Sequence, residues 1–183
     1  MYASRELAAA FRTVRNNTIQ IAEEIPEEHY TFVPAPGTKS VSEQLQHIAF
    51  GTMIHYDFHR DKKLTTLKGY DFGAMLGRMN AEEHKPRNKA EIIALLKKEG
   101  DEFEAWLLSL SPALLAETFT DMTEQNPRSR LEHLLGAKEH EMHHRGQLML
   151  IQRMLGLVPH LTRQREERAR ARAAAAQTAQ TVS

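Results

Sequence analysis

The sequence predicts an all-α protein that folds as a four-helix bundle of the up-and-down type. Apolar residues recur at the helical spacing of three and four over four segments, at about residues 5–24, 40–60, 88–110 and 129–156. No segment alternates apolar and polar residues with the two-residue period of a half-buried strand. Long amphipathic helices without strands bury their apolar faces against one another, which is the architecture of a helix bundle.

The composition fits one globular domain and excludes several classes of function. The 183 residues are 41% hydrophobic and 26% charged, and Lys+Arg 24 balances Asp+Glu 24, so we expect neither a membrane partner nor a nucleic-acid partner. The chain has no cysteine, which excludes disulfides, a catalytic thiol and thiolate-bound metal. The longest uncharged run in the middle, at residues 105–116, is too short to cross a bilayer. The charged N-terminal segment lacks the apolar stretch of a signal peptide, so we expect a cytoplasmic protein.

The first two helices have identifiable ends. The first covers about residues 5–24, and Pro26 stops it because proline cannot continue a helix. The second begins at Ser40 with a capping box, in which the Ser40 hydroxyl accepts from the Glu43 amide and the Glu43 carboxylate returns the bond. We expect this helix to continue to about Arg60.

Residues 61–87 show the weakest pattern in the chain. Gly69, Gly73 and Gly77 recur every four residues among aromatic and methionine side chains. We expect a loop with a weak helical turn, and the alternative is a mobile flap over a pocket.

The second half of the chain contains the remaining helices. Asn88 caps the third helix, and residues 111–112 (Ser-Pro) begin a short further helix. The fourth helix begins at a second capping box, from Ser129 to Glu132, and ends near Gly156, a plausible C-cap. These positions complete the four long helices that the bundle needs.

An Arg/Ala-rich tail, residues 163–183, follows the bundle domain of residues 1–162. The tail holds five arginines and two glutamates, followed by a run of alanines. Alanine and arginine are strong helix formers, so an exposed helix and a disordered tail are both open. We expect the tail to be dispensable for metal binding.

Histidine is the unusual residue of this chain, with ten copies. His140 and His144 are four residues apart, so they are neighbours on one face of the fourth helix, and that face is the apolar one. Two unpaired imidazoles inside a bundle are costly, whereas two imidazoles at this spacing can bind one metal ion. Gln147 shares their face, and His143 lies at its edge.

A third ligand has to come from another helix. His47, beside the small residue Gly51, is the leading candidate, and His55 and His59 lie further along the same helix. His133 lies seven residues before His140, about 10 Å away along the helix axis, so it cannot reach the same ion. We interpret His133 as a capping, core or surface residue.

Three stretches of the sequence resemble the DinB/YfiT-like family of metal-dependent four-helix-bundle enzymes. They are His140–Gln147 (H-x-x-H-H-R-G-Q), Ser40–His47, and residues 30–40 with the Pro-x-Pro-Gly of residues 34–37. The resemblance covers about residues 5–160. It implies a homodimeric bundle with one divalent metal held by three histidines, which by position are His47, His140 and His144.

The resemblance also implies a chemistry. Family members with known activity include thiol-dependent S-transferases and a thiol-dependent isomerase, and nickel and zinc are the expected ions, with iron, manganese and cobalt as alternatives. Three neutral imidazoles leave coordination positions open and leave the ion its full charge, which lowers the pKa of a bound thiol. The chain has no cysteine, so the thiol would be a low-molecular-weight cosubstrate that is transferred to a small electrophilic substrate.

Alternatives remain open at the level of the sequence. A metal-dependent hydrolase would use His143 or Glu141 as a base, and a non-catalytic metal-binding dimeric module would need no base. Gln147 and His143 are placed to hydrogen-bond a ligand histidine or a substrate. Arg145 points away from the ligands, and we expect it to form a structural salt bridge or an interface contact.

Overall fold

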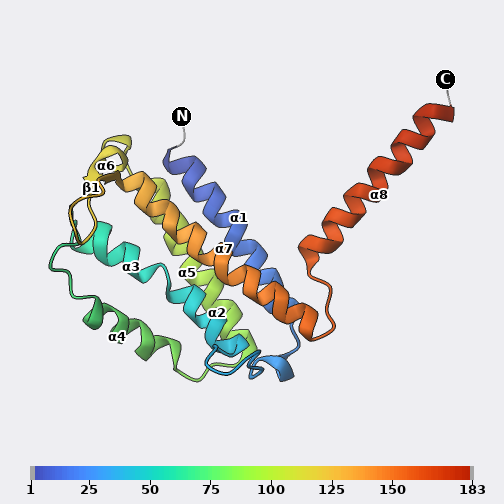
Figure 1. The fold of residues 1–183 in the computed structure, drawn as a ribbon, viewed down its shortest axis with the longest axis horizontal. Coiled ribbons are helices and arrows are strands. Elements are labelled where there is room, and N and C mark those ends of the chain that lie inside the picture. Colours follow the sequence, from blue (N-terminus) through green and yellow to red (C-terminus); the bar gives the residue numbers. More distant parts are fainter. Residues whose placement is uncertain (1–2, 182–183) are drawn as a thin grey trace.

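The computed structural model describes residues 3–181, and it confirms the four-helix bundle. The long helices are α1 (Ser4–Glu24), α2 (Val41–Phe50), α5 (Lys89–Ser109) and α7 (Arg130–Met154) (Figure 1). The Ser40, Asn88 and Ser129 side chains each accept from the backbone amide three residues on, so the three predicted caps are formed.

The four long helices do not simply alternate in direction along the chain, as the up-and-down expectation implies. Helices α1 and α7 run in one direction, and α2 and α5 run together in the opposite one (Figure 1). Contacts agree with this: Lys89, at the start of α5, reaches the carbonyl of Ile25 beyond the end of α1, and Gln152 near the end of α7 reaches Glu24. The connection of residues 62–88 is long enough to return along the bundle, so α5 starts at the same end as α2.

The second helix is shorter than expected, because it does not continue to Arg60. Helix α2 ends at Phe50 and is followed by α3 (Met53–His55) and a π-helical segment, η2 (Tyr56–Asp61). The chain makes a turn at residues 51–52 before the helical path resumes. Wider π-turns often occur at functional sites, and this one carries His59.

Residues 61–87 do not form the predicted loop with a weak turn. They contain α4 (Phe72–Glu83), a helix of twelve residues that packs against α2. Asp71 caps it by accepting from the Ala74 amide. Its buried residues are Met75, Met79 and Glu83, which are spaced by four and form one narrow stripe.

Short elements close the ends of the bundle. These are η1 (Glu27–His29), α6 (Pro112–Ala116), and an antiparallel pair of two-residue strands, β1 (Thr118–Phe119) and β2 (Arg128–Ser129). The strand pair has no counterpart in the sequence prediction, because two residues are too few to show an alternating pattern.

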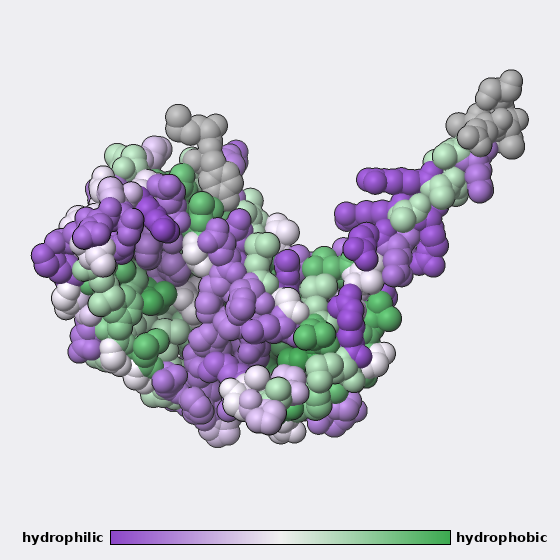
Figure 2. Space-filling model, viewed as in Figure 1, coloured by the Kyte–Doolittle hydropathy of each residue, from purple (hydrophilic) through white to green (hydrophobic). Residues whose placement is uncertain are grey.

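The tail is helical. Helix α8 (His160–Thr181) projects from the bundle and is largely hydrophilic along its described length (Figures 1 and 2). Its first turn belongs to the body, since His160 is buried and Arg163 pairs with Glu24. The division at residue 162 therefore falls within a continuous helix, and the independence of the tail stays a prediction. None of the described helices has a stretch long and apolar enough to span a membrane.

The centre of the bundle is polar as well as apolar. Phe103, Leu107 and Ile151 are buried as predicted, and Trp106 and Leu155 pack against the core from partly buried positions. A fully buried ion pair between Arg15 and Glu141 lies among these apolar side chains. Arg15 also donates to the carbonyls of Leu96 and Ile48, so this one side chain ties α1 to α7, α5 and α2.

Candidate metal centre

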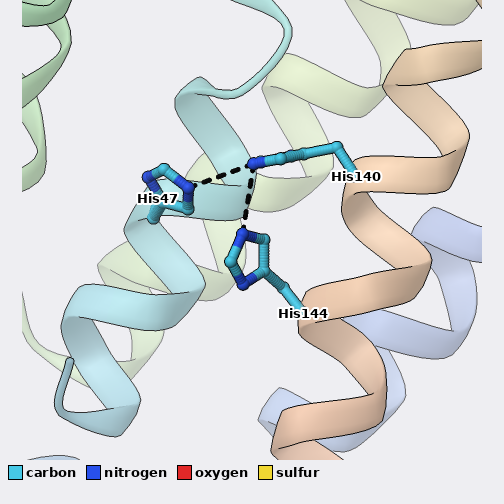
Figure 3. A group of neighbouring side chains, drawn as sticks. All are labelled: His47, His140 and His144. Carbon is cyan, nitrogen blue, oxygen red and sulfur yellow. Dashed lines mark hydrogen bonds between the residues drawn. The ribbon is translucent and has the colours of Figure 1, made fainter. Parts of the chain in front are cut away.

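Three histidine side chains meet between α2 and α7 with their Nε2 atoms turned toward one another (Figure 3). The Nε2 atom of His140 lies 3.1 Å from that of His47 and 3.1 Å from that of His144. We call this group the His47 trio. The structure thus brings together the three residues that the sequence suggested as ligands.

The backbone around the trio explains how the rings fit. His140 and His144 lie one turn apart on α7, and His47 lies one turn before Gly51 on α2. A Cβ atom at Gly51 would stand 2.9 Å from the Cε1 and Nδ1 atoms of His140, which is too close for any real contact. Glycine at this position therefore gives the His140 ring its space.

A buried carboxylate holds His47. Its Nδ1 atom lies 2.7 Å from Oε1 of Glu83 on α4, and Lys39 donates to the other oxygen at 2.9 Å. Burial raises the pKa of Glu83, but the hydrogen bonds from His47 and Lys39 outweigh it and keep this pKa below its ordinary value. Glu83 is therefore ionised and accepts the Nδ1 hydrogen, which leaves the Nε2 lone pair of His47 facing the other rings.

Sequence reasoning missed Glu83, because the helix that carries it was not predicted. The available signal was the spacing of Met75, Met79 and Glu83 behind the capping residue Asp71. Gly73 and Gly77 lie inside the same segment and weaken this helical pattern.

An amide pair holds His144. The Oε1 atom of Gln147 lies 2.8 Å from Nδ1 of His144 and accepts from Gln44 at 2.7 Å. The Gln44 amide is also in contact with Nδ1 of His144. Gln147 thus contacts one histidine of the trio, and the exposed His143 contacts both Gln147 and the edge of the His144 ring, with ring centroids 4.8 Å apart.

The protonation of the trio suits a cation. Burial lowers the pKa of His140 to about 4, with the neighbouring histidines adding to the effect, and burial also lowers the pKa of His144. The rings of His140 and His144 are therefore neutral at pH 7, and each offers one lone pair. Nδ1 of His47 donates to Glu83, so in the neutral ring Nε2 of His47 is the lone-pair atom that faces His140.

A divalent cation would satisfy all three nitrogens at once. Imidazole nitrogens that ligate zinc lie about 2.0–2.1 Å from the ion, and in a tetrahedron such nitrogens are roughly 3.3 Å apart. The contacts of 3.1 Å at His140 agree with that arrangement. The donor set therefore fits a borderline metal such as zinc or nickel.

Glu141 does not take the role of a base and Arg145 does not form the expected salt bridge among the described residues, whereas an interface contact of Arg145 stays a prediction. Glu141 cannot act as a base at the centre, because both of its oxygens lie 3.0 Å from Nε of the buried Arg15. Arg145 forms no ion pair among the described residues, and its buried Nε lacks a hydrogen-bond partner there.

A second histidine group lies nearby. His55, His59 and His133, which we call the His133 trio, also place ring nitrogens within 4.8 Å of one another. His55 and His59 therefore do not join the His47 trio. His133 is a partly buried residue of this second group, which agrees with its interpretation as something other than a ligand of the first ion.

A cavity of about 470 Å³ connects the two trios. His47 and His140 line one end, and His55 and His133 line the other. The walls between them are mostly apolar and come from α3, η2, the following loop and α4: Ile54, Phe58, Leu67, Phe72, Leu76 and Met79. Helix α7 adds Gly136 and the carboxylate of Glu139 between His133 and His140.

Comparisons with known proteins agree with the fold. The model of the DinB superfamily matches residues 10–148. The DinB-like protein YjoA of Bacillus subtilis is 22% identical, with a TM-score of 0.60 over 82% of this chain and 92% of its own. YfiT of the same organism, described as a probable metal-dependent hydrolase with an unusual four-helix bundle topology, is 16% identical, with a TM-score of 0.63 over 84% of this chain and 88% of its own.

A protein of Clostridium difficile 630 is similar at 13% identity, with a TM-score of 0.62 over 84% of this chain and 97% of its own. No curated protein matches the chain. At these identities the solved structures share the fold, and the superfamily model covers most of the sequence. The chain belongs to the DinB superfamily.

Proposed function

We propose that this protein is a metal-dependent enzyme that activates a low-molecular-weight thiol for transfer to a small electrophile. The observation that carries the proposal is the convergence of three Nε2 atoms at the end of an apolar cavity. Three protein ligands leave coordination positions for a substrate, as in catalytic rather than structural sites.

The protein's own residues prepare this reaction. When bound, the cation would lower the pKa of a thiol so that the thiolate is available at neutral pH. Glu83 holds His47 in the tautomer that presents Nε2, and the Gln147 side chain contacts Nδ1 of His144 and so orients that ring. The apolar walls exclude water and hold the electrophile against the thiol. In the transfer, the thiol proton passes to solvent, a carbon–sulfur bond forms and the bond from carbon to the leaving group breaks.

Hydrolysis is the second candidate. YfiT, a similar structure, is described as a probable metal-dependent hydrolase. The same open centre would serve an attacking water, and His143 is the remaining candidate base, since Glu141 is bound to Arg15. A non-catalytic metal-binding module would need neither reaction.

One assay separates these functions. Full-length protein loaded with zinc or nickel is offered chlorodinitrobenzene with a panel of thiols, and a nitrophenyl ester without thiol. We expect thiol-dependent conjugation that is lost in His140→Ala and retained in His29→Phe, which changes a histidine outside the cavity. Ester cleavage without conjugation would favour the hydrolase, and metal binding without either activity would favour the module.

The homodimer is also a proposal. Leu150, Met154 and Val158, near the end of α7 and the start of α8, are large apolar side chains that are about half exposed. Apolar side chains grouped on a surface favour association with a partner. Sedimentation equilibrium of the full chain should give twice the chain mass, and Leu150→Glu should shift it to the monomer.

A further inference from the structure

The two histidine trios differ in the side chain that contacts Nδ1 of one of their histidines. In the His47 trio, Nδ1 of His47 contacts the carboxylate of Glu83. In the His133 trio, Nδ1 of His59 contacts the guanidinium of Arg130, whose Nη1 atom lies 2.9 Å away. Arg130 is buried and is held in place by Glu117, which accepts from its Nε at 2.9 Å.

The guanidinium fixes the direction of the hydrogen bonds. Arginine has only N–H donors, so Nδ1 of His59 must be the acceptor. Neutral His59 then carries its hydrogen on Nε2, which lies 2.9 Å from Nδ1 of His133. His133 accepts this bond, so its own hydrogen lies on Nε2. The chain Arg130–His59–His133 therefore donates in one direction, and it ends on an N–H of a residue that lines the cavity.

The charge state agrees with this direction. Burial lowers the pKa of His59 to about 2, and the charges of its histidine neighbours and Arg130 add to the effect. Burial lowers the pKa of His133 to about 4, with Arg128 and Arg130 adding to it. Both rings are neutral at pH 7.

The same arrangement disfavours a second metal ion. Both nitrogens of His59 are engaged, one with Arg130 and one with His133. A cation here would also meet the guanidinium of Arg130 at close range. The two trios have similar spacing but different chemistry. The ring nitrogens of the His47 trio converge on one point, whereas the His133 trio forms a chain of hydrogen-bond donors.

We propose that the His133 end of the cavity binds an anionic acceptor, such as a carboxylate, on the small molecule whose reacting group lies at the His47 trio. This inference rests on the proposed function, because it concerns a substrate of the same cavity. Arg128 lines that end as well and adds a positive charge. Glu132, also at that end, already accepts from the backbone and side chain of Ser129 as part of a cap.

The geometry sets the length of such a molecule. His133 and His140 are seven residues apart on one helix, which separates them by about 10 Å along the axis. Both side chains lean toward the start of the helix, so the ends of the side chains are separated by a similar distance. The apolar walls fit a hydrocarbon segment between the two polar ends. Arg130 acts through His59 and His133, so it is a positioning residue.

The test uses thiols that differ only at the far end. Cobalt-loaded, full-length protein is titrated with mercaptohexanoate and with mercaptohexanol, and the sulfur-to-cobalt absorption band reports binding. We expect the carboxylate to bind about tenfold or more tighter than the alcohol, as a charge-assisted hydrogen bond would give. The shorter mercaptopropionate should bind less tightly than mercaptohexanoate, because it cannot span the cavity.

Substitutions of His133 test whether this residue is the hydrogen-bond donor to the carboxylate. His133→Phe should abolish the preference for the carboxylate, so that mercaptohexanoate and mercaptohexanol bind with similar affinity. His133→Gln should restore part of the preference, since its amide can accept from His59 and donate into the cavity. His29→Phe is the control with no expected effect. Equal binding of both thiols to the unmodified protein would overturn this inference alone, whereas absence of an absorption band with either thiol would overturn the proposed thiol chemistry.

A second readout needs no variant. Nitrogen NMR of the histidine rings in the full-length protein distinguishes protonated from unprotonated nitrogens. We expect Nε2 of His59 and of His133 to carry the hydrogen, and zinc to change the signals of the His47 trio only. A second zinc equivalent that perturbs His59 and His133 would overturn the donor chain and make this trio a metal site.

Discussion

Glu83 accepts the Nδ1 hydrogen of His47 at 2.7 Å, from a helix that packs on α2 and is absent from the sequence prediction. This contact fixes the tautomer of His47 and presents its Nε2 atom to His140. It is the arrangement in which metal-binding histidines are commonly oriented by a carboxylate.

Removing this carboxylate should weaken metal binding without unfolding the protein. We expect Glu83→Gln to lower zinc affinity by about 10- to 100-fold, because His47 loses its orienting charge. Competition with a chromophoric chelator measures the affinity. Glu82→Gln, at the half-buried neighbouring position on the same helix, pairs with Lys85 rather than with a histidine and is the matched control, and equal effects of the two changes would contradict the role of Glu83.

Gly51 should be required for the metal centre rather than for the fold. In Gly51→Ala the added methyl would stand 2.9 Å from the His140 ring, so the ring has to move from its position in the trio. We expect zinc affinity to fall by about tenfold or more, since ligand positions tolerate little displacement. Gly146→Ala, which meets nothing within 4 Å on α7, should keep full affinity and raise helix stability slightly. Unchanged zinc affinity in Gly51→Ala would contradict the requirement for glycine beside the His140 ring.

The buried ion pair should support the fold and not the chemistry. Glu141→Leu leaves the charge of Arg15 buried without a partner, which should lower the free energy of unfolding by about 3–5 kcal/mol. Urea denaturation measures the loss. The double variant Arg15→Met/Glu141→Leu removes both charges and should recover much of the stability. A single variant that is as stable as the unmodified protein would contradict this assignment.

The metal-free protein should lose stability on acidification. Burial lowers the pKa of His55 to about 3, of His59 to about 2 and of His133 to about 4, against about 6.5 in the unfolded chain. The unfolded state therefore binds more protons below pH 6.5, so the stability present at pH 7 is lost as the pH falls toward these folded-state values. Denaturation at pH 7 and pH 5 should differ by about 1 kcal/mol or more for each such histidine. His55→Leu should show a smaller difference, and a pH-independent stability would contradict the burial of neutral rings.

The sequence could predict those parts of the site that depend on one helix. The four-residue spacing places His140 and His144 together on α7 whatever the rest of the chain does, and the caps at Ser40 and Ser129 are local patterns. The break of the second helix at residues 51–52 and the π-turn after it depend on packing between helices. They move His59 to another part of the bundle, where it meets His133.

Helix α4 was not predicted, because Gly73 and Gly77 weaken its helical pattern and the segment is interpreted as a loop with a weak turn. Its stability comes from the side chains that it buries against the bundle, Met75 and Met79 among them. The cavity and the contact from Glu83 to His47 depend on this helix, so both became visible only in three dimensions.

The most direct test of the metal centre is the metal content of purified variants. Protein purified without an affinity metal and reconstituted with zinc should hold one ion per chain by elemental analysis. His47→Ala, His140→Ala and His144→Ala should each abolish stoichiometric binding, because each removes one of the three converging nitrogens. His55→Ala and His133→Ala should keep one ion per chain. A full equivalent of zinc in His140→Ala, or its loss in His133→Ala, would contradict the assignment of the ion to His47, His140 and His144.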